Sequence, residues 1–191
     1  MNIPMETWPQ RHRITADQYC RMAELGLLAS DARVELIEGE IFDMPALGKD
    51  HESVVDQLTR LFVRAVADLA IVRVQGSLRL SDLSMPQPDV VLLKPRADFY
   101  RSRRAGASDA LLVVEVSDST LPFDRDVKVP LYARHGIPEV WIVDLRDDRL
   151  LVFRSPVNGE YEDKTWASTP AVAAIAALPH VSIDLTGLLE A

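Results

Sequence analysis

The chain lacks several features that would point to a secreted or membrane-spanning protein. Its 191 residues contain a single cysteine, Cys20, so no disulfide can form within the chain, and no Cys/His spacing typical of a zinc site occurs. The longest purely apolar run, AVAAIAAL at residues 171–178, is far shorter than the roughly 18 residues that span a bilayer. The first thirteen residues contain no apolar stretch of the kind found in secretory signals. We therefore expect a cytoplasmic protein without a membrane span.

Positive charge is also scarce. The chain has 21 lysine and arginine residues against 29 aspartate and glutamate residues, which gives a formal net charge of −8. This balance argues against a protein that grips nucleic acid over its whole surface, because phosphate contacts need clustered basic side chains, although a local basic patch stays open. The length suits one domain with a real core, so we expect an arm at residues 1–13 and a single domain at residues 14–191.

Hydrophobic spacing predicts three helices. Residues 16–27 should form a helix that begins with a capping box at Thr15 and buries Tyr19 and Leu27 on one face. The segment GKDHESVVDQLTRLFVRAVADLA predicts a longer helix with Asp50 as its N-cap. The segment FDRDVKVPLYARHG predicts a third, which should carry Pro130 in its first turn because proline is disfavoured in a helix interior.

Short apolar or alternating segments predict the strands. A hairpin is expected in RVELIEGEIFDMP, with a tight turn at Glu38-Gly39. The other expected strands lie in IVRVQGSLRLS, PQPDVVLLKP, ALLVVEVS, PEVWIVDL, RLLVFRS, GEYEDKTW and VSIDLTGLLE, the last ending in a helical turn. This order of elements predicts an α/β fold with a mixed central sheet.

A carboxylate interrupts the most apolar of these strands. The first six residues of LLVVEVSDST run from Leu111 to Val116, and Glu115 is the only one of them that is not apolar. Burying a lone carboxylate costs several kcal/mol unless a counter-charge meets it, and that charge could belong to a basic side chain or to a metal ion. We expect a divalent ion, shared with Asp89 at the start of the preceding strand.

Asp89, Glu115 and Lys128 together suggest hydrolytic chemistry. Carboxylates at adjacent strand ends can hold Mg²⁺ through their oxygens, and a nearby lysine can orient an attacking water or neutralise developing charge. Each residue also has a structural explanation. Asp89 could belong to a turn after Pro88, Glu115 could form a salt bridge, and Lys128 could be a surface lysine. His51 could belong to the same site, or it could be an ordinary polar residue in the first turn of the long helix.

Several segments resemble a known family. PDVVLL, LLVVEVSDST and DRDVKVPLYARHGIPEVWIVD, preceded by VELIEGEI and by a histidine in the next helix, resemble the Uma2 family, which is similar to restriction endonucleases and belongs to the PD-(D/E)XK nuclease superfamily. The resemblance covers about residues 15–155. It implies a restriction endonuclease-like core, a mixed central β-sheet flanked by helices, and DNA cleavage that depends on Mg²⁺ or Mn²⁺.

The resemblance also assigns roles to residues. It implies that Asp89 matches the aspartate of PD and Glu115 the acid of (D/E)XK, that both bind the metal, and that Lys128 completes the catalytic set. The superfamily lysine would fall at Ser117, so this chain fits a variant whose lysine comes from the following helix. Glu35 and His51 match family positions that line the same pocket, as additional site residues.

The sequence signals for a nucleic-acid-binding surface and for binding partners are less specific. The segment KPRADFYRSRR could follow a phosphate backbone or form an ordinary surface loop, and its candidate nucleic-acid contacts are Arg96, Arg101, Arg103 and Arg104. The resemblance implies DNA and a second copy of the chain as partners. Two other functions stay open: a nuclease-derived binding or assembly module that no longer cuts, which the acidic surface and Ser117 favour, and a metal-dependent hydrolase of another substrate. Tyr132 and Trp141 are expected in the core.

Overall fold

The computed structural model describes residues 9–29, 31–168 and 171–189, so most of the expected arm lies outside the described residues. The helices are α1 (Ala16–Glu24), α2 (Lys49–Val66), α3 (Leu121–Phe123) and α4 (Val129–Arg134), and a π-helical turn (Asp124–Lys128) joins α3 to α4. The strands are β1 (Val34–Ile37), β2 (Glu40–Asp43), β3 (Ile71–Val74), β4 (Val90–Leu93), β5 (Ala110–Ser117), β6 (Glu139–Asp144), β7 (Arg149–Val157), β8 (Glu160–Ser168), β9 (Val172–Ile175) and β10 (Leu178–Asp184).

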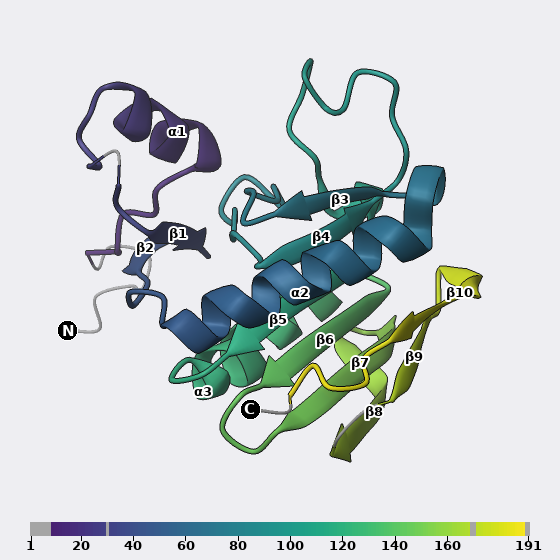
Figure 1. Ribbon diagram of the computed structural model, residues 1–191. Coiled ribbons are helices and arrows are strands. Elements are labelled where there is room, and N and C mark those ends of the chain that lie inside the picture. Colours follow the sequence, from purple (N-terminus) through teal and green to yellow (C-terminus); the bar gives the residue numbers. More distant parts are fainter. Residues whose placement is uncertain (1–8, 30, 169–170, 190–191) are drawn as a thin grey trace.

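Six strands form one mixed sheet in the order β3-β4-β5-β6-β7-β8. Only β5 and β6 pair in parallel, and the other neighbours are antiparallel. The helix α2 crosses one face of this sheet, and α3 and α4 lie on the opposite face (Figure 1). The hairpins β1-β2 and β9-β10 form two separate two-stranded sheets. The predicted α/β fold with a mixed central sheet flanked by helices is confirmed.

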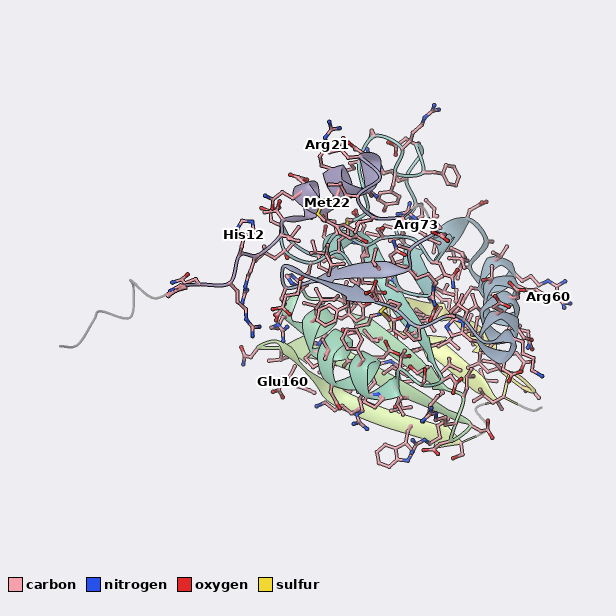
Figure 2. All side chains as sticks on the ribbon, turned by 90° about the vertical axis from the view of Figure 1, so that its left-hand side faces the viewer. His12, Arg21, Met22, Arg60, Arg73 and Glu160 are labelled. Atoms are coloured by element: carbon pink, nitrogen blue, oxygen red, sulfur yellow. The ribbon has the colours of Figure 1, made fainter. Side chains whose placement is uncertain are left out.

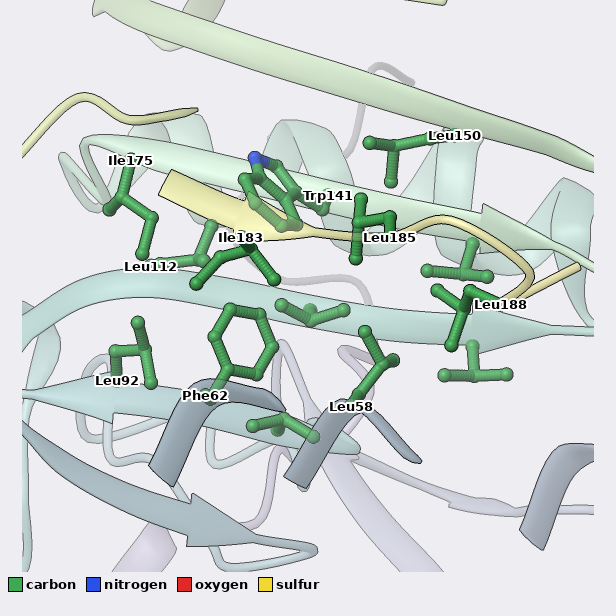
Figure 3. Close-up of a cluster of buried hydrophobic side chains, with 14 of the residues drawn as sticks. Leu58, Phe62, Leu92, Leu112, Trp141, Leu150, Ile175, Ile183, Leu185 and Leu188 are labelled. Atoms are coloured by element: carbon green, nitrogen blue, oxygen red, sulfur yellow. The ribbon is translucent and has the colours of Figure 1, made fainter. Parts of the chain in front are cut away.

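Each face of the sheet has its own core. Alternate residues of β5 explain this, because successive side chains of a strand point to opposite faces. Val114 joins the cluster under α2, where the Phe62 and Trp141 rings lie 5.8 Å apart (Figure 3), and Val113 joins the cluster under α4. Glu115 shares the strand face of Val113, so the sheet presents its carboxylate to the side covered by α3 and α4.

The first helix and the first hairpin agree with their sequence signals, with one exception. The Thr15 hydroxyl accepts from the Gln18 backbone N–H, and the Gln18 side chain accepts from the Thr15 N–H, so the capping box is confirmed. Positive φ angles at Glu38 (50°) and Gly39 (83°) make the tight turn between β1 and β2. The predicted burial of Leu27 is wrong, because α1 ends at Glu24 and Leu27 is exposed.

The long helix α2 lies where the sequence predicted it, but its N-cap differs from the prediction. It begins at Lys49, and its N-cap is Gly48 rather than Asp50. Its buried residues are His51, Val54, Val55, Leu58, Phe62 and Val66. Figure 2 shows this helix nearly along its axis, with Arg60 on its outer surface and α1, which carries Arg21, in the upper part of the molecule. None of the described helices is long and apolar enough to cross a membrane.

The third helix differs most from its prediction. Helical backbone runs without a break from Leu121 to Arg134, so Pro130 lies inside it and Lys128 is not near its start. A proline inside an α-helix loses one hydrogen bond and its ring clashes with the carbonyl four residues earlier. The π-helical turn directly before Pro130, in which the Val129 N–H reaches back five residues to the Asp124 carbonyl, interrupts the α-helical ladder at this point.

Candidate functional site

Strand pairing brings Asp89 to Glu115. The strands β4 and β5 are antiparallel with Val90 opposite Val114, so Asp89, which directly precedes Val90, lies beside the end of β5. The Val116 N–H donates to Asp89 Oδ2 at 2.8 Å, and His51 Nε2 lies 3.1 Å from the same oxygen. A backbone donor and an imidazole therefore orient the buried Asp89 carboxylate.

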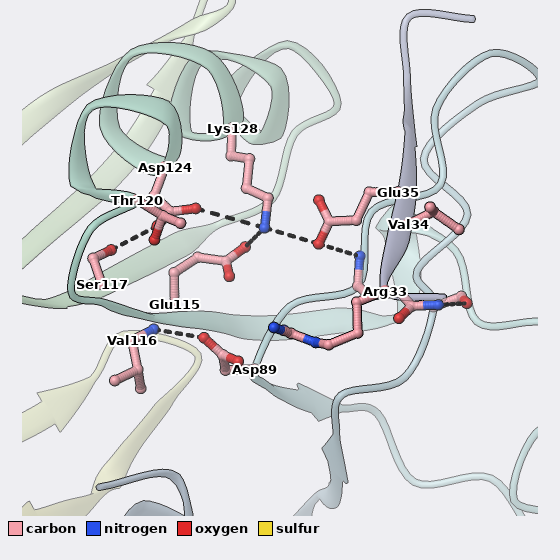
Figure 4. A network of polar contacts seen from close by, with 12 residues as sticks. Arg33, Val34, Glu35, Asp89, Glu115, Val116, Ser117, Thr120, Asp124 and Lys128 are labelled. Atoms are coloured by element: carbon pink, nitrogen blue, oxygen red, sulfur yellow. Dashed lines mark hydrogen bonds and ion pairs between the residues drawn. The ribbon is translucent and has the colours of Figure 1, made fainter. Parts of the chain in front are cut away.

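The Lys128 ammonium lies among three carboxylates. Its Nζ atom is 3.0 Å from Glu35 Oε1, 3.2 Å from Glu115 Oε1 and 3.6 Å from Asp124 Oδ1 (Figure 4). All four side chains are 2–3% exposed. Within the described part of the chain, the charge that meets Glu115 is therefore this lysine, and a divalent ion shared with Asp89 stays a prediction. Among the described residues Asp89 makes no ion pair with Lys128, and its Oδ2 atom contacts His51 Nε2 and the Val116 N–H instead.

Ser117, which stands where the superfamily pattern would have its lysine, also contacts this cluster of charged side chains. Its hydroxyl donates to Asp124 Oδ2 at 2.7 Å, and the Thr120 hydroxyl donates to the same oxygen at 2.6 Å. Two hydroxyls thus hold the Asp124 carboxylate while its other oxygen faces Lys128. Sequence reasoning did not identify this role, because the contact depends on the π-helical turn that places Asp124 over the end of β5.

Tyr132 is a site residue that the sequence analysis missed. It is fully buried, as expected for a core residue, but its hydroxyl donates to Glu115 Oε1 at 2.6 Å. The spacing of four residues from Lys128 was the available signal, because residues four apart lie on the same face of a helix. Two donors from consecutive turns therefore meet the same carboxylate oxygen.

A cavity of about 50 Å³ lies at this end of the sheet. Its lining includes Arg33, Glu35, His51, Asp89, Glu115, Asp124 and Lys128. Two buried polar atoms of these lining residues have no hydrogen-bond partner among the described residues, Glu35 Oε2 and His51 Nδ1. In the described part of the chain no group of three or more His, Cys, Asp or Glu residues is placed to hold a metal ion. Two carboxylates in one cavity still suit Mg²⁺, which commonly takes its remaining ligands from water and substrate.

Burial and mutual repulsion set the protonation of the acids. Loss of water around Glu115 raises its pKa well above the ordinary value, Lys128 opposes this, and Asp124 adds to it. Burial raises the pKa of Glu35 as well. Burial alone would lower the pKa of Lys128, but the attraction of Glu115, Glu35 and Asp124 outweighs it and raises that pKa. The ammonium therefore stays charged, and burial favours the protonated forms of Glu115 and Glu35 beside it.

The raised pKa of Glu35 predicts how stability depends on pH. Because the pKa of Glu35 is raised in the folded chain, the folded state binds more protons than the unfolded state above the ordinary value of 4.5, and its contribution to stability falls as pH rises. At pH 8 we expect Glu35→Gln to be more stable than wild type by about 1 kcal/mol, since the neutral amide replaces a carboxylate whose ionised form is disfavoured by burial. At pH 5 this gap in the free energy of unfolding between the two proteins should be smaller.

Urea unfolding of both proteins at pH 5 and pH 8 measures this gap. Titrating groups outside the cluster, such as His135, contribute to both proteins and cancel in the difference. A gap that widens toward pH 5 would contradict the prediction.

The basic loop lies away from the cavity. It connects the far ends of β4 and β5, opposite the ends that carry Asp89 and Glu115. Arg96 pairs with Asp98, and Arg103 makes two bonds to Asp109 at 2.6 and 2.7 Å. The guanidinium carbons of Arg96 and Arg103 also lie 5.7 and 5.2 Å from the centre of the Tyr100 ring. Two other arginines of the loop, Arg101 and Arg104, are exposed. The structure therefore does not bring these arginines to the carboxylates.

Comparisons with known proteins agree with the fold. No curated protein matches the chain. A solved structure described as a "putative nuclease belonging to DUF820" from Anabaena variabilis superimposes with a TM-score of 0.68 at 16% sequence identity, covering 92% of this chain and 97% of the other. The model of the Uma2 family, described as "Putative restriction endonuclease", matches residues 16–186. Because this match spans nearly the whole sequence, the chain belongs to the Uma2 family.

Proposed function

We propose that this Uma2 protein is a metal-dependent endonuclease that hydrolyses phosphodiester bonds of DNA. The observation that carries the proposal is the enclosure of Asp89, Glu115 and Lys128, from three separate segments of the chain, in one cavity at the edge of the sheet. Membership of a family described as restriction endonucleases supports nuclease activity in general. The assignment of DNA, of Mg²⁺ or Mn²⁺, and of each catalytic role belongs to this proposal.

Asp89 and Glu115 would bind the metal ion. A divalent ion bound there would polarise a phosphoryl oxygen and lower the pKa of a water molecule. The protein's own contribution is orientation, since His51 and the Val116 N–H hold Asp89 in place. Lys128 would stabilise the negative charge that develops on the phosphate during attack. Glu35 shares the Lys128 ammonium, and its other oxygen has no hydrogen-bond partner among the described residues.

The substrate path and the assembly stay predictions. Arg33 is the described arginine that lines the cavity itself, so it could meet a phosphate there in addition to Lys128. Arg101 and Arg104 could contact only a part of the nucleic acid that lies far from the cleaved bond. A homodimer and a cytoplasmic location likewise rest on the resemblance and on the sequence.

A cleavage assay with and without metal tests the proposal. The purified protein is incubated with linear and circular double-stranded DNA, single-stranded DNA and RNA, in Mg²⁺, in Mn²⁺ and in EDTA. We expect cleavage of DNA that needs the metal and is lost in EDTA. Asp89→Asn, prepared in the same way, should not cleave, and Glu52→Gln, an exposed acid in the first turn of α2, should cleave like wild type.

The outcomes separate the alternatives. Equal cleavage by Asp89→Asn and wild type would reject this site. No cleavage by any protein, together with a shift of DNA mobility on binding, would favour the nuclease-derived binding module. Metal-dependent hydrolysis of a simple phosphodiester, with all nucleic acids left intact, would favour a hydrolase of another substrate.

A further inference from the structure

We propose that Tyr132 is a positioning residue for Glu115. Its hydroxyl holds one carboxylate oxygen of Glu115, so that the other oxygen is presented to the metal ion. The inference rests on the proposed function, because it concerns the same ion. It adds a residue to the site from a position that the sequence pattern explains as core packing.

The hydrogen bonds of Glu115 divide its two oxygens. Oε1 accepts from Tyr132 at 2.6 Å and from Lys128 at 3.2 Å. Oε2 accepts no hydrogen bond from any described residue. A carboxylate with one oxygen held by the protein can rotate only about that anchor, and its free oxygen is the one that can coordinate a cation.

Tyr132 is the more specific of the two anchors. Lys128 divides its ammonium among Glu35, Glu115 and Asp124, at distances from 3.0 to 3.6 Å. The Tyr132 hydroxyl makes its only hydrogen bond within the described chain to Glu115, and that bond is the shorter. The phenol is fully buried among apolar side chains of the core under α4, which fixes where its hydroxyl lies.

The charge of the two donors also differs. An ammonium beside Glu115 repels a divalent cation that approaches the same carboxylate, since like charges in a site of low polarity interact strongly. A neutral phenol orients the carboxylate without this repulsion. Tyr132 therefore orients Glu115 without adding positive charge, whereas Lys128 is shared among three carboxylates.

Removal of the hydroxyl tests this role. Tyr132→Phe keeps the ring and its packing but removes the anchor. The matched control is Tyr161→Phe, because Tyr161 lies in the same core and its hydroxyl donates at 2.8 Å to the Ile137 carbonyl, a group outside the site. Mn²⁺ binding is measured without substrate from the electron paramagnetic resonance signal of free Mn²⁺, and unfolding in urea is measured in parallel.

We expect Tyr132→Phe to weaken Mn²⁺ binding about five- to tenfold and Tyr161→Phe to leave Mn²⁺ binding unchanged. Both variants should lose a similar free energy of unfolding. Tyr132→Met, which also lacks the hydroxyl, serves if the phenylalanine variant does not fold, and it should weaken binding likewise. Mn²⁺ affinity equal to wild type in the Tyr132 variants, or weakened equally in Tyr161→Phe, would overturn the inference.

The two proposals fail in distinguishable ways. If wild type binds Mn²⁺ and cleaves DNA but the Tyr132 variants bind Mn²⁺ as wild type does, only the role of Tyr132 is rejected. If wild type neither binds Mn²⁺ nor cleaves any nucleic acid, the proposed function is rejected and the role of Tyr132 with it.

Discussion

Replacing Lys128 with methionine is expected to lower the free energy of unfolding by about 3–5 kcal/mol. Methionine fills most of the space of the lysine side chain but leaves Glu35, Glu115 and Asp124 facing one another without a cation, and each of these acids is only 3% exposed. Breaking a buried ion pair by removing one partner is strongly destabilising, because the remaining charges stay out of water. The folded variant would have to take up protons, so its loss of stability should be larger at pH 8 than at pH 5.

Urea unfolding of Lys128→Met at both pH values measures this effect. Lys49→Met, at an exposed lysine in the first turn of α2, is the control and should change stability by less than about 0.5 kcal/mol. Adding Glu35→Gln to Lys128→Met removes one of the unbalanced charges and should recover part of the loss. If Lys128→Met is as stable as Lys49→Met, then Lys128 does not hold these carboxylates together.

Replacing Glu115 with glutamine is expected to reduce DNA cleavage about 10³-fold, equivalent to roughly 4 kcal/mol of transition-state stabilisation, without a loss of stability. Glutamine keeps an oxygen that can accept from Tyr132 but removes the charge that would bind the metal. Burial raises the pKa of Glu115 well above its ordinary value, so its ionised form destabilises the folded chain at neutral pH. The neutral amide removes that cost, and activity and stability should therefore change in different directions.

A second buried glutamate provides the control. Glu139 is fully buried at the start of β6, where it accepts from the Trp141 and Arg154 side chains and from the Ala176 N–H. Glu139→Gln should lose stability because Arg154 loses its counter-charge, but its cleavage rate per folded molecule should match wild type. Cleavage by Glu115→Gln at more than about a tenth of the wild-type rate would contradict the role given to Glu115.

The elements that the sequence predicted well are those whose signal is local. The capping box at Thr15 and the turn at Glu38-Gly39 depend on residues within a few positions of each other, and both are confirmed. The apolar segments that form β4, β5 and β6 are buried whatever their neighbours are, so their burial could be predicted too. The run AVAAIAAL shows the limit, because it contains β9 and the turn into β10, which no periodic pattern indicated.

The third helix shows where local rules failed. Pro130 suggested a helix start, but the chain enters the helix nine residues earlier and meets Pro130 through a π-helical turn. A π-helical turn has no sequence signature of its own, and it is stable here because Asp124 and Lys128 both find partners in the buried cluster. Those partners lie on other elements, so neighbouring residues could not reveal them.

The sequence by itself determined which residue types were available for chemistry and where they stand in the chain: an acid at the start of β4, an acid within a buried strand, and a lysine in the helix that follows. It was enough to predict the fold class and the family. Only the tertiary structure decided that Lys128 forms an ion pair with Glu115, that Ser117 orients Asp124, and that the Tyr132 hydroxyl contacts Glu115. The physical reason is that each of these contacts joins side chains from different elements, and hydrogen bonds at 2.6–3.2 Å require a register and a helix placement that the packing of the whole sheet sets.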